Sequence, residues 1–330
     1  MMNNTKDIRP MTRRTFVAGS LLMATGIVQA SNTWPDNKPM TWVVPYPPGG
    51  STDVLARNIA RLIDKALDTR VIVENRPGAT GTIGAARVAR ADPNGLTLLG
   101  TSIGPQAIAP HIIKNLPYDP IADFAPVIML GTIPHVLVVG AKQPYRTVQD
   151  LVQAASKAPG TLAYASGGTG TILHMQGELL QIQSGAKFIH VPYKGDSPAL
   201  QDTLGGQVQF MFAPVAAAIP HIKNGALRPL AVTSSKQLAS LPDIPTMEHE
   251  GFDDFVVEQW QAVFVPAATP PEIISRLNSA ISAGLGAPNV IDLASQLGIT
   301  LVAGSPQELD QVRKSDFIKW GKVIQQANIK

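Results

Sequence analysis

The chain has 330 residues, no cysteine and a formal net charge of +3. The lack of cysteine excludes disulfides, thiolate metal sites and a cysteine nucleophile. The length exceeds what a single hydrophobic core comfortably serves, so two lobes are expected.

Residues 1–30 have the pattern of a cleaved signal peptide. A basic segment precedes a short apolar run at residues 16–28, which is too short for a membrane span. The twin arginines Arg13 and Arg14 favour the Tat export route, with the general route as the alternative. The leader holds four of the 27 basic and one of the 24 acidic residues. The remainder is therefore uncharged overall, which argues against a nucleic-acid partner.

Strand and helix patterns alternate along the rest of the chain, which predicts an α/β fold. Strands are expected at residues 41–46, 69–76, 97–102, 161–166, 187–193, 208–214 and 227–234. Helices are expected at residues 51–66, 77–91, 147–158, 172–183, 197–206, 271–285 and 305–327. Ser51 or Thr52 is expected to cap the first helix, and Ser305 with Glu308 fits a capping box at the last.

Two long extended runs, at residues 128–140 and 255–266, bracket the middle of the chain. They predict two crossings between lobes, and hence a hinge. Lobe 1 would comprise residues 31–131 and 258–330, and lobe 2 residues 132–257.

Two loops share one chemistry. "VVPYPPGGSTDVLARNIA" and "LAYASGGTGTILHMQGEL" both run from a strand through glycine, serine and threonine into a helix. Glycine lets the backbone approach a ligand, and the first turn of a helix offers unpaired N–H groups at the positive end of its dipole. Each loop is therefore a candidate site for a carboxylate or phosphate. The alternative is that both are ordinary strand-to-helix turns.

The common catalytic and cofactor motifs are missing from the sequence. Neither loop ends in Gly-Lys-Ser/Thr, and Gly78, Gly81 and Gly84 lack the dinucleotide spacing. The histidines show no local metal-ligand spacing, and no nucleophile elbow is present. We therefore predict no cofactor, no metal and no enzymatic activity. An exported hydrolase that uses Ser166 and His174 stays as a minor alternative.

Several segments resemble the Bug family, the extracytoplasmic solute receptors of tripartite tricarboxylate transporters. They include "VPYPPGGSTDVLAR", "VIVENRPGATGTIGAARVARADPNGLTLL", "YASGGTGTILHMQGE", "VPYKGDSPALQDTLGGQVQFMF" and "LRPLAVTSSKQLASLPDIPTMEHEGF". The resemblance covers about residues 35–330. It implies a two-lobed periplasmic-binding-protein fold of type II, a Venus flytrap, with a hinge of two crossing strands. It also implies that an organic carboxylate is gripped by the two loops, partly through ordered waters.

The resemblance also implies the ligand contacts. The first loop would contribute Tyr46, Pro47, Gly49, Gly50, Ser51, Thr52 and Asp53. The second would contribute Ser166, Gly168, Thr169, Gly170, Thr171 and His174. Further contacts are expected from Gly81, Thr82, Thr101, Ser102, Tyr193, Lys194, Phe212 and Ala213. Asp53 also suits the first turn of its helix, where it would order its own loop.

Asp196 departs from the family pattern, in which a small residue is common. In the cleft its charge would disfavour a second carboxylate, but we expect it to cap the helix that begins near Ser197. The expected ligand is a mono- or dicarboxylate, aromatic acids included, because Tyr46, Tyr193 and Phe212 could accommodate a ring. We expect a periplasmic monomer that delivers its ligand to membrane permease subunits. Signalling to a membrane sensor is the alternative output.

Overall fold

The computed structural model describes residues 34–329, and within them ten strands form one mixed sheet. The predicted leader lies outside the described residues. The strands are β1 (Met40–Val44), β2 (Val71–Asn75), β3 (Thr97–Ser102), β4 (Phe124–Gly140), β5 (Ala163–Ser166), β6 (Ile189–Pro192), β7 (Phe210–Pro214), β8 (Leu227–Val232), β9 (Glu258–Pro266) and β10 (Thr300–Leu301). The predicted α/β fold is confirmed.

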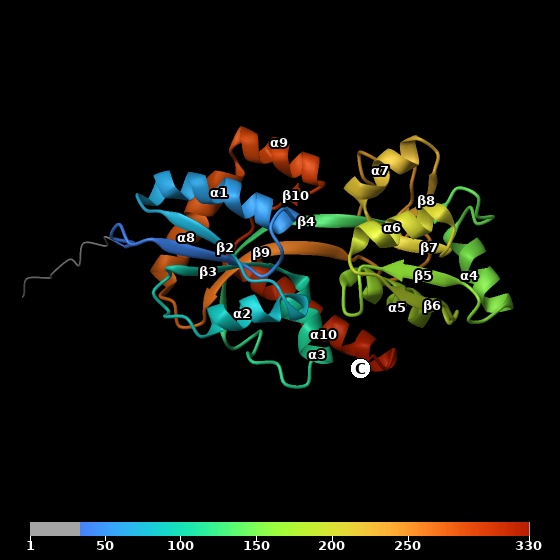
Figure 1. The fold of residues 1–330 in the computed structure, drawn as a ribbon, viewed down its shortest axis with the longest axis horizontal. Coiled ribbons are helices and arrows are strands. Elements are labelled where there is room, and N and C mark those ends of the chain that lie inside the picture. The colour runs from blue at the N-terminus through green and yellow to red at the C-terminus, as the bar shows by residue number, and fades with distance from the viewer. Residues whose placement is uncertain (1–33, 330) are drawn as a thin grey trace, which may run out of the picture. The chain divides into compact units, whose positions relative to one another are not determined.

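Helices connect most of these strands (Figure 1). The α-helices are α1 (Ser51–Leu67), α2 (Thr82–Ala89), α3 (Ala109–Ile112), α4 (Val148–Lys157), α5 (Ile172–Ser184), α6 (Asp196–Gly205), α7 (Val215–Lys223), α8 (Pro271–Leu285), α9 (Pro288–Leu297) and α10 (Pro306–Gln326). Two short turns of other helical types are η1 (Ala79–Gly81) and η2 (Gly104–Ile108). The capping box predicted for the last helix is present, since Ser305 Oγ accepts from Glu308 N–H and the Glu308 carboxylate accepts from Ser305 N–H.

The sheet has two parts that share β4. In the first part, β1 lies parallel to β2 and β3, and β9 is antiparallel to both β3 and β4. In the second part, β5 lies parallel to β6 and β7, and β4 is antiparallel to β7 and β8. The change of partner is abrupt, because Pro134 still pairs with Glu258 of β9 while His135 pairs with Pro214 of β7. Strand β4 therefore passes from one lobe into the other.

Helices cover the two parts of the sheet separately. In Figure 1, α1, α8 and α9 lie over one face of the first part and α2 and α3 over the other, while α4 to α7 surround the second part. Helix α10 is the exception. It packs on η2 and β4 and also on α5, and it is fixed to α3 where His111 Nε2 lies 2.8 Å from the Phe317 carbonyl oxygen.

The hydrophobic core consists of two clusters that lie on opposite faces of the first part of the sheet. The boundary between the clusters therefore does not follow the boundary between the lobes. Because side chains alternate along a strand, Trp42 and Val44 join the cluster beneath α1, α8 and α9, whereas Val43 joins the other cluster. That second cluster continues without a break into the other lobe, through residues such as Trp260 and Phe212. Apolar packing therefore runs across the crossing strands.

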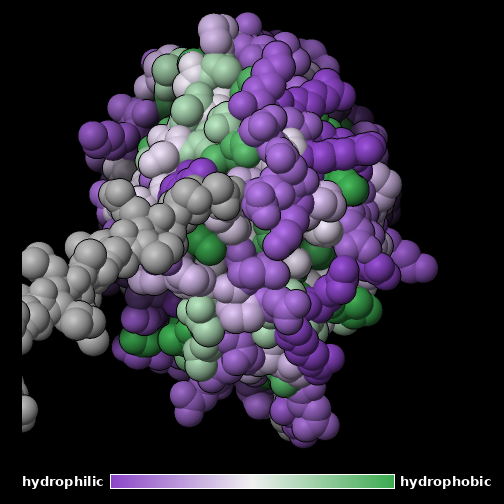
Figure 2. Space-filling view, turned by 90° about the vertical axis from the view of Figure 1, so that its left-hand side faces the viewer, coloured by the Kyte–Doolittle hydropathy of each residue, from purple (hydrophilic) through white to green (hydrophobic). Residues whose placement is uncertain are grey.

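The face turned to the viewer in Figure 2 is mainly hydrophilic, and hydrophobic residues are seen on it singly or in small groups. Within residues 34–329, no helix combines the length and the apolar character needed to cross a membrane.

Candidate functional site

A cavity of about 240 Å³ lies where the β1–α1 loop meets the β5–α5 loop. Its lining residues come from six places in the chain: Tyr46, Gly50, Ser51, Thr52, Thr80, Ser102, Ile103, Gly104, Gly170, Thr171, Ile172, Leu173, Asp196 and Gln259. Seven of the sequence-predicted site residues are among them, namely Tyr46, Gly50, Ser51, Thr52, Ser102, Gly170 and Thr171. The structure thus brings the two loops to one cavity.

The first loop is held from behind by Asp53. Its carboxylate accepts hydrogen bonds from Gly49 N–H at 2.9 Å, from Asn75 Nδ2 at 2.9 Å and from Arg57 Nε at 3.1 Å. Burial acts to raise the pKa of Asp53, but the hydrogen bonds from Arg57, Gly49 and Asn75 outweigh it and the pKa lies below its usual value. Asp53 therefore orders the loop, and it does not itself line the cavity.

The cap expected for α1 is wrong. Gly50 is the N-cap residue in extended conformation, and no side chain caps the helix. Ser51 Oγ instead accepts a hydrogen bond of 2.9 Å from Gln261 Nε2. Because Ser51 Oγ already accepts from Gln261, its own proton can be donated into the cavity. The N–H groups in the first turn of α1 that have no intrahelical partner are likewise available to donate to a ligand or to water.

The second loop owes its shape to two glycines and a threonine. Gly168 and Gly170 have φ of +131° and +80°, values that glycine adopts without strain. Thr171 is the N-cap of α5, accepting from His174 N–H at 3.4 Å and donating to the Gly168 carbonyl at 2.8 Å. The first turn of α5 therefore opens into the cavity through Thr171, Ile172 and Leu173.

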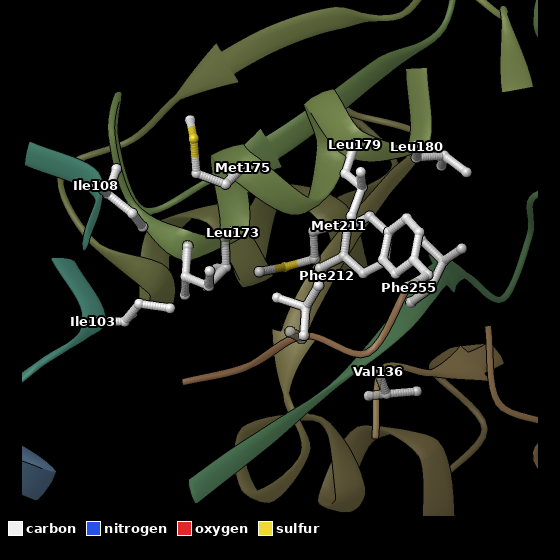
Figure 3. Packing of buried hydrophobic residues seen from close by; sticks show 14 of the residues in the cluster. Ile103, Ile108, Val136, Leu173, Met175, Leu179, Leu180, Met211, Phe212 and Phe255 are labelled. Carbon is white, nitrogen blue, oxygen red and sulfur yellow. The ribbon is translucent and has the colours of Figure 1, made fainter. Parts of the chain in front are cut away.

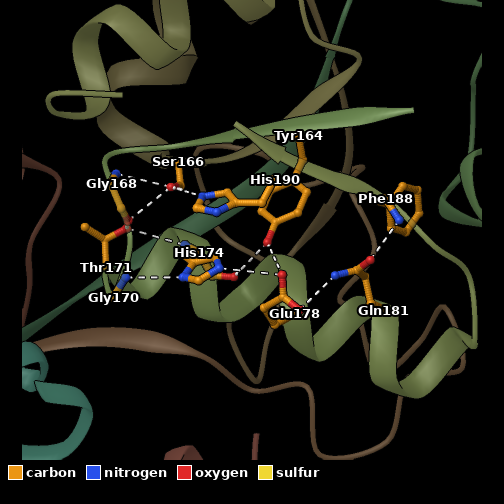
Figure 4. A network of polar contacts seen from close by, with 10 residues as sticks. All are labelled: Tyr164, Ser166, Gly168, Gly170, Thr171, His174, Glu178, Gln181, Phe188 and His190. Carbon is orange, nitrogen blue, oxygen red and sulfur yellow. Dashed lines mark hydrogen bonds and ion pairs between the residues drawn. The ribbon is translucent and has the colours of Figure 1, made fainter. Parts of the chain in front are cut away.

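A buried polar network supports this loop from below (Figure 4). Ser166 Oγ lies 2.6 Å from His190 Nε2 and accepts from Gly168 N–H at 3.1 Å. His174 Nδ1 accepts from Gly170 N–H at 3.2 Å, and its Nε2 lies 3.6 Å from Glu178. The predicted ligand contacts Ser166 and His174 are thus 0% and 4% exposed and hold the loop rather than line the cavity. The partner of Ser166 is His190, not His174.

The other predicted residues lie beside the cavity or away from it. Pro47, Gly49, Thr169 and Lys194 are at least partly exposed outside it, Thr82 and Thr101 are buried, and Gly81 packs against Pro45 and Pro105. Tyr193 donates a 2.6 Å hydrogen bond to Asp202. Phe212 and Ala213 are fully buried in β7, where they pair with Leu137 and Val136. Phe212 and Ala213 therefore belong to the hydrophobic core and not to the cavity.

Two apolar residues form one wall of the cavity. Ile103, which precedes η2, and Leu173 of α5 lie side by side in Figure 3 and belong to the same core cluster. On another wall, Tyr46 Oη lies 2.6 Å from Ser102 Oγ. Burial raises the pKa of Tyr46, partly offset by its hydrogen bond to Ser102, so its hydroxyl stays protonated at neutral pH.

Sequence reasoning missed Thr80, Ile103, Gly104, Ile172, Leu173 and Gln259. Gln259 lies in a crossing strand, where the facing direction depends on register with β4, which the sequence does not reveal. The preference for Asp196 as a helix cap is wrong. Gly195 is the N-cap of α6, no side-chain capping bond forms, and Asp196 lines the cavity.

The side chains that line the cavity carry little charge. Among its described lining residues there is no lysine, arginine or histidine. Positive potential comes instead from the first turns of α1 and α5, and Asp196 supplies the single carboxylate. Such a cavity can bind an anion through neutral hydrogen-bond donors.

Comparison with known proteins agrees with this geometry. Residues 55–329 match the family described as the tripartite tricarboxylate transporter family receptor. The chain belongs to this family. The Bordetella pertussis protein BugT is 35% identical over 97% of this receptor and 99% of BugT.

Two solved structures resemble the receptor closely. An R. palustris protein solved with adipate is 33% identical, with a TM-score of 0.77 over 90% of this chain and 99% of that one. MatC from Rhodopseudomonas palustris, with bound malate, is 30% identical, with a TM-score of 0.74 over 87% and 99% of the two chains. These likenesses confirm the predicted two-lobed periplasmic-binding fold and the Bug-type resemblance.

The receptor is a solute-binding protein and not an enzyme. The hydrolase alternative is therefore wrong, and its physical obstacle is plain, because Ser166 has no exposed surface that a substrate could reach. The signalling alternative is not addressed by the family match and stays a prediction.

Proposed function

We propose that this receptor captures a small organic carboxylate in the cavity between the β1–α1 and β5–α5 loops. The observation that carries the proposal is that the first turns of α1 and α5 line one cavity with no cationic side chain among its described lining residues. A carboxylate there would accept hydrogen bonds from backbone N–H groups and from the Ser51 hydroxyl, which already accepts from Gln261.

The size of the cavity supports a small ligand. At about 240 Å³ it lies below the roughly 300–1,000 Å³ typical of sites for drug-sized molecules. The adipate and malate in the two related structures are acids of this class. The only ring among the cavity-lining residues is Tyr46, so an aromatic acid is a less natural ligand than an aliphatic one.

Closure of two lobes around the ligand is part of the proposal. We assign residues 31–131 and 258–330 to lobe 1 and residues 132–257 to lobe 2. The change of strand partner between Pro134 and His135 supports a hinge at this point of β4. Closure would exclude water and strengthen the hydrogen bonds to the carboxylate. Helix α10, which also packs on α5, would have to slide or move with the second lobe.

The ligand would then be passed to membrane permease subunits of a tripartite transporter. This role fits a monomeric receptor in the periplasm, exported by a cleaved signal peptide at residues 1–30 through the twin-arginine route. Mass spectrometry of the N-terminus of the secreted protein would test the cleavage.

Titration calorimetry with aliphatic mono-, di- and tricarboxylates, and with aromatic acids, tests the ligand class. At least one aliphatic acid should bind, and Gly50→Leu should weaken its binding at least tenfold. Gly50 has ordinary extended backbone, and a Cβ there meets only the Pro47 carbonyl oxygen at 3.8 Å, so the variant should fold.

Gly205→Ala is the matched control, because Gly205 is an exposed helical glycine with open space around it and lies outside the cavity. It should bind as the wild type does. Failure of the wild-type protein to bind any acid, or unchanged affinity in Gly50→Leu, would overturn the proposal.

A further inference from the structure

Asp196 contributes the single carboxylate among the described residues that line the cavity. It is the first residue of α6 and lies against the β5–α5 loop. A Cβ built on Gly167 would come within 2.1 Å of Asp196 Oδ1, so the absence of a side chain at Gly167 makes room for this carboxylate. The entry to α6 is fixed there, since Tyr193 N–H donates to the Ser166 carbonyl at 3.0 Å and Gly195 N–H to the Gly167 carbonyl at 3.1 Å.

The carboxylate of Asp196 has no hydrogen-bond or ion-pair partner among the described side chains. The contrast with Asp53 is informative, because that carboxylate is held by three donors. Asp196 is exposed in this structure, so water can still solvate its carboxylate. A carboxylate left unpaired in a cavity that closes around a ligand is costly unless the ligand neutralises it.

The lining of the cavity therefore combines groups with opposite charge preferences. The first turns of α1 and α5 favour an anionic group. Asp196 repels a second anion and favours a cation or a hydrogen-bond donor. A ligand that satisfies both carries opposite charges on its two ends.

We propose that Asp196 makes this receptor selective for small acids that carry an ammonium group as well as a carboxylate, such as aliphatic amino acids. The carboxylate binds at the first turns of α1 and α5, and the ammonium group binds at Asp196. Discrimination against a dicarboxylate of the same length then comes from repulsion at Asp196 as well as from attraction of the amine. This inference rests on the proposed function and specifies its ligand.

Calorimetry with matched ligands tests the inference. Glycine, β-alanine, 4-aminobutyrate and 5-aminovalerate would each be compared with the diacid and the monoacid of the same chain length. At the best-fitting length, the wild-type receptor should bind the amino acid at least tenfold more tightly than the diacid. Asp196→Asn, which keeps the size but removes the charge, should weaken amino-acid binding at least tenfold and strengthen diacid binding. Asp292→Asn, at an exposed position on α9, is the charge-matched control and should leave both affinities unchanged.

The outcomes separate this inference from the proposed function. If the wild type binds diacids or monoacids at least as well as amino acids, and Asp196→Asn does not change the ratio, the inference is wrong while carboxylate binding stands. If the wild type binds none of these acids, the proposed function fails and the inference with it.

Discussion

The imidazole rings of His174 and His190 are stacked, with centroids 3.8 Å apart and planes 14° from parallel. Both rings lie beneath the β5–α5 loop, where His174 Nδ1 accepts from Gly170 N–H and His190 Nε2 lies 2.6 Å from Ser166 Oγ (Figure 4). Two positive charges at this separation would repel strongly. The stacked arrangement that supports the loop is therefore stable only when at least one of the two imidazoles is neutral.

Acid should therefore destabilise the ligand-free receptor. Burial, and next the neighbouring His174, lower the pKa of His190 to about 4, although Glu178 opposes this. An unfolded histidine has a pKa of about 6.5, so the unfolded chain takes up the proton first as the pH falls. Stability contributed by neutral His190 is complete above pH 6.5, falls between pH 6.5 and 4, and levels off below.

Urea unfolding at pH 7 and pH 5 checks this prediction. His190→Gln should reduce the loss of unfolding free energy between the two pH values by on the order of 1–2 kcal/mol. The pKa of buried His135 is also lowered, to about 3, so part of the acid sensitivity should persist. His249→Gln, on the surface, is the control. An equal acid loss in wild type and His190→Gln would contradict the argument.

Removal of the Tyr46 hydroxyl should weaken ligand binding with little effect on folding. Within the Tyr46–Ser102 pair one hydroxyl donates to the other, which leaves one proton available to a ligand in the cavity. Tyr46→Phe should cost about 1 kcal/mol of binding free energy, roughly a fivefold weaker affinity. Ser102→Ala should cost about as much, and the double variant less than the sum, because the two hydroxyls act together. Strictly additive losses would show that the pair does not share a proton.

Substitutions of Arg313 and Lys314 should differ sharply in their effect on the free energy of unfolding, although both side chains contact Asp310. Arg313 is 2% exposed and donates to the carbonyls of Pro120 and Phe124, whereas the Lys314 side chain is 55% exposed. Arg313→Met should lower the unfolding free energy by about 3 kcal/mol or more, since two buried carbonyls lose their donor. Lys314→Met should change it by less than about 1 kcal/mol. Equal effects in chemical denaturation would mean that the buried contacts contribute little.

Substitution by alanine should have opposite effects on the stability of the fold at two helical glycines. At Gly177 in α5, a Cβ would lie 2.1 Å from the ring of buried Tyr164. Gly177→Ala should therefore destabilise the fold by roughly 1–3 kcal/mol despite its better helix propensity. At exposed Gly205 the space is open, and Gly205→Ala should stabilise by up to about 1 kcal/mol. Melting temperatures that move in the same direction for both variants would refute the steric account.

The sequence by itself determined the alternation of strands and helices, the long runs that became β4 and β9, and the pairing of two glycine-rich loops. These features are local, because period-2 and helical patterns and glycine-rich turns are written in neighbouring residues. It also determined the family, since the same motifs recur in order along the chain. Even the role of Asp53 in ordering its own loop followed from its position in the first turn of a helix.

The tertiary structure alone decided which residues line the cavity. Ser166 and His174 lie on the second loop and its helix, but packing against His190 and Glu178 turns them beneath the loop. Gln259 reaches the cavity because of strand register, and Asp196 because Gly167, twenty-nine positions earlier, leaves space for it. Such relations depend on side chains from distant segments that meet only after folding, so no local pattern could predict them.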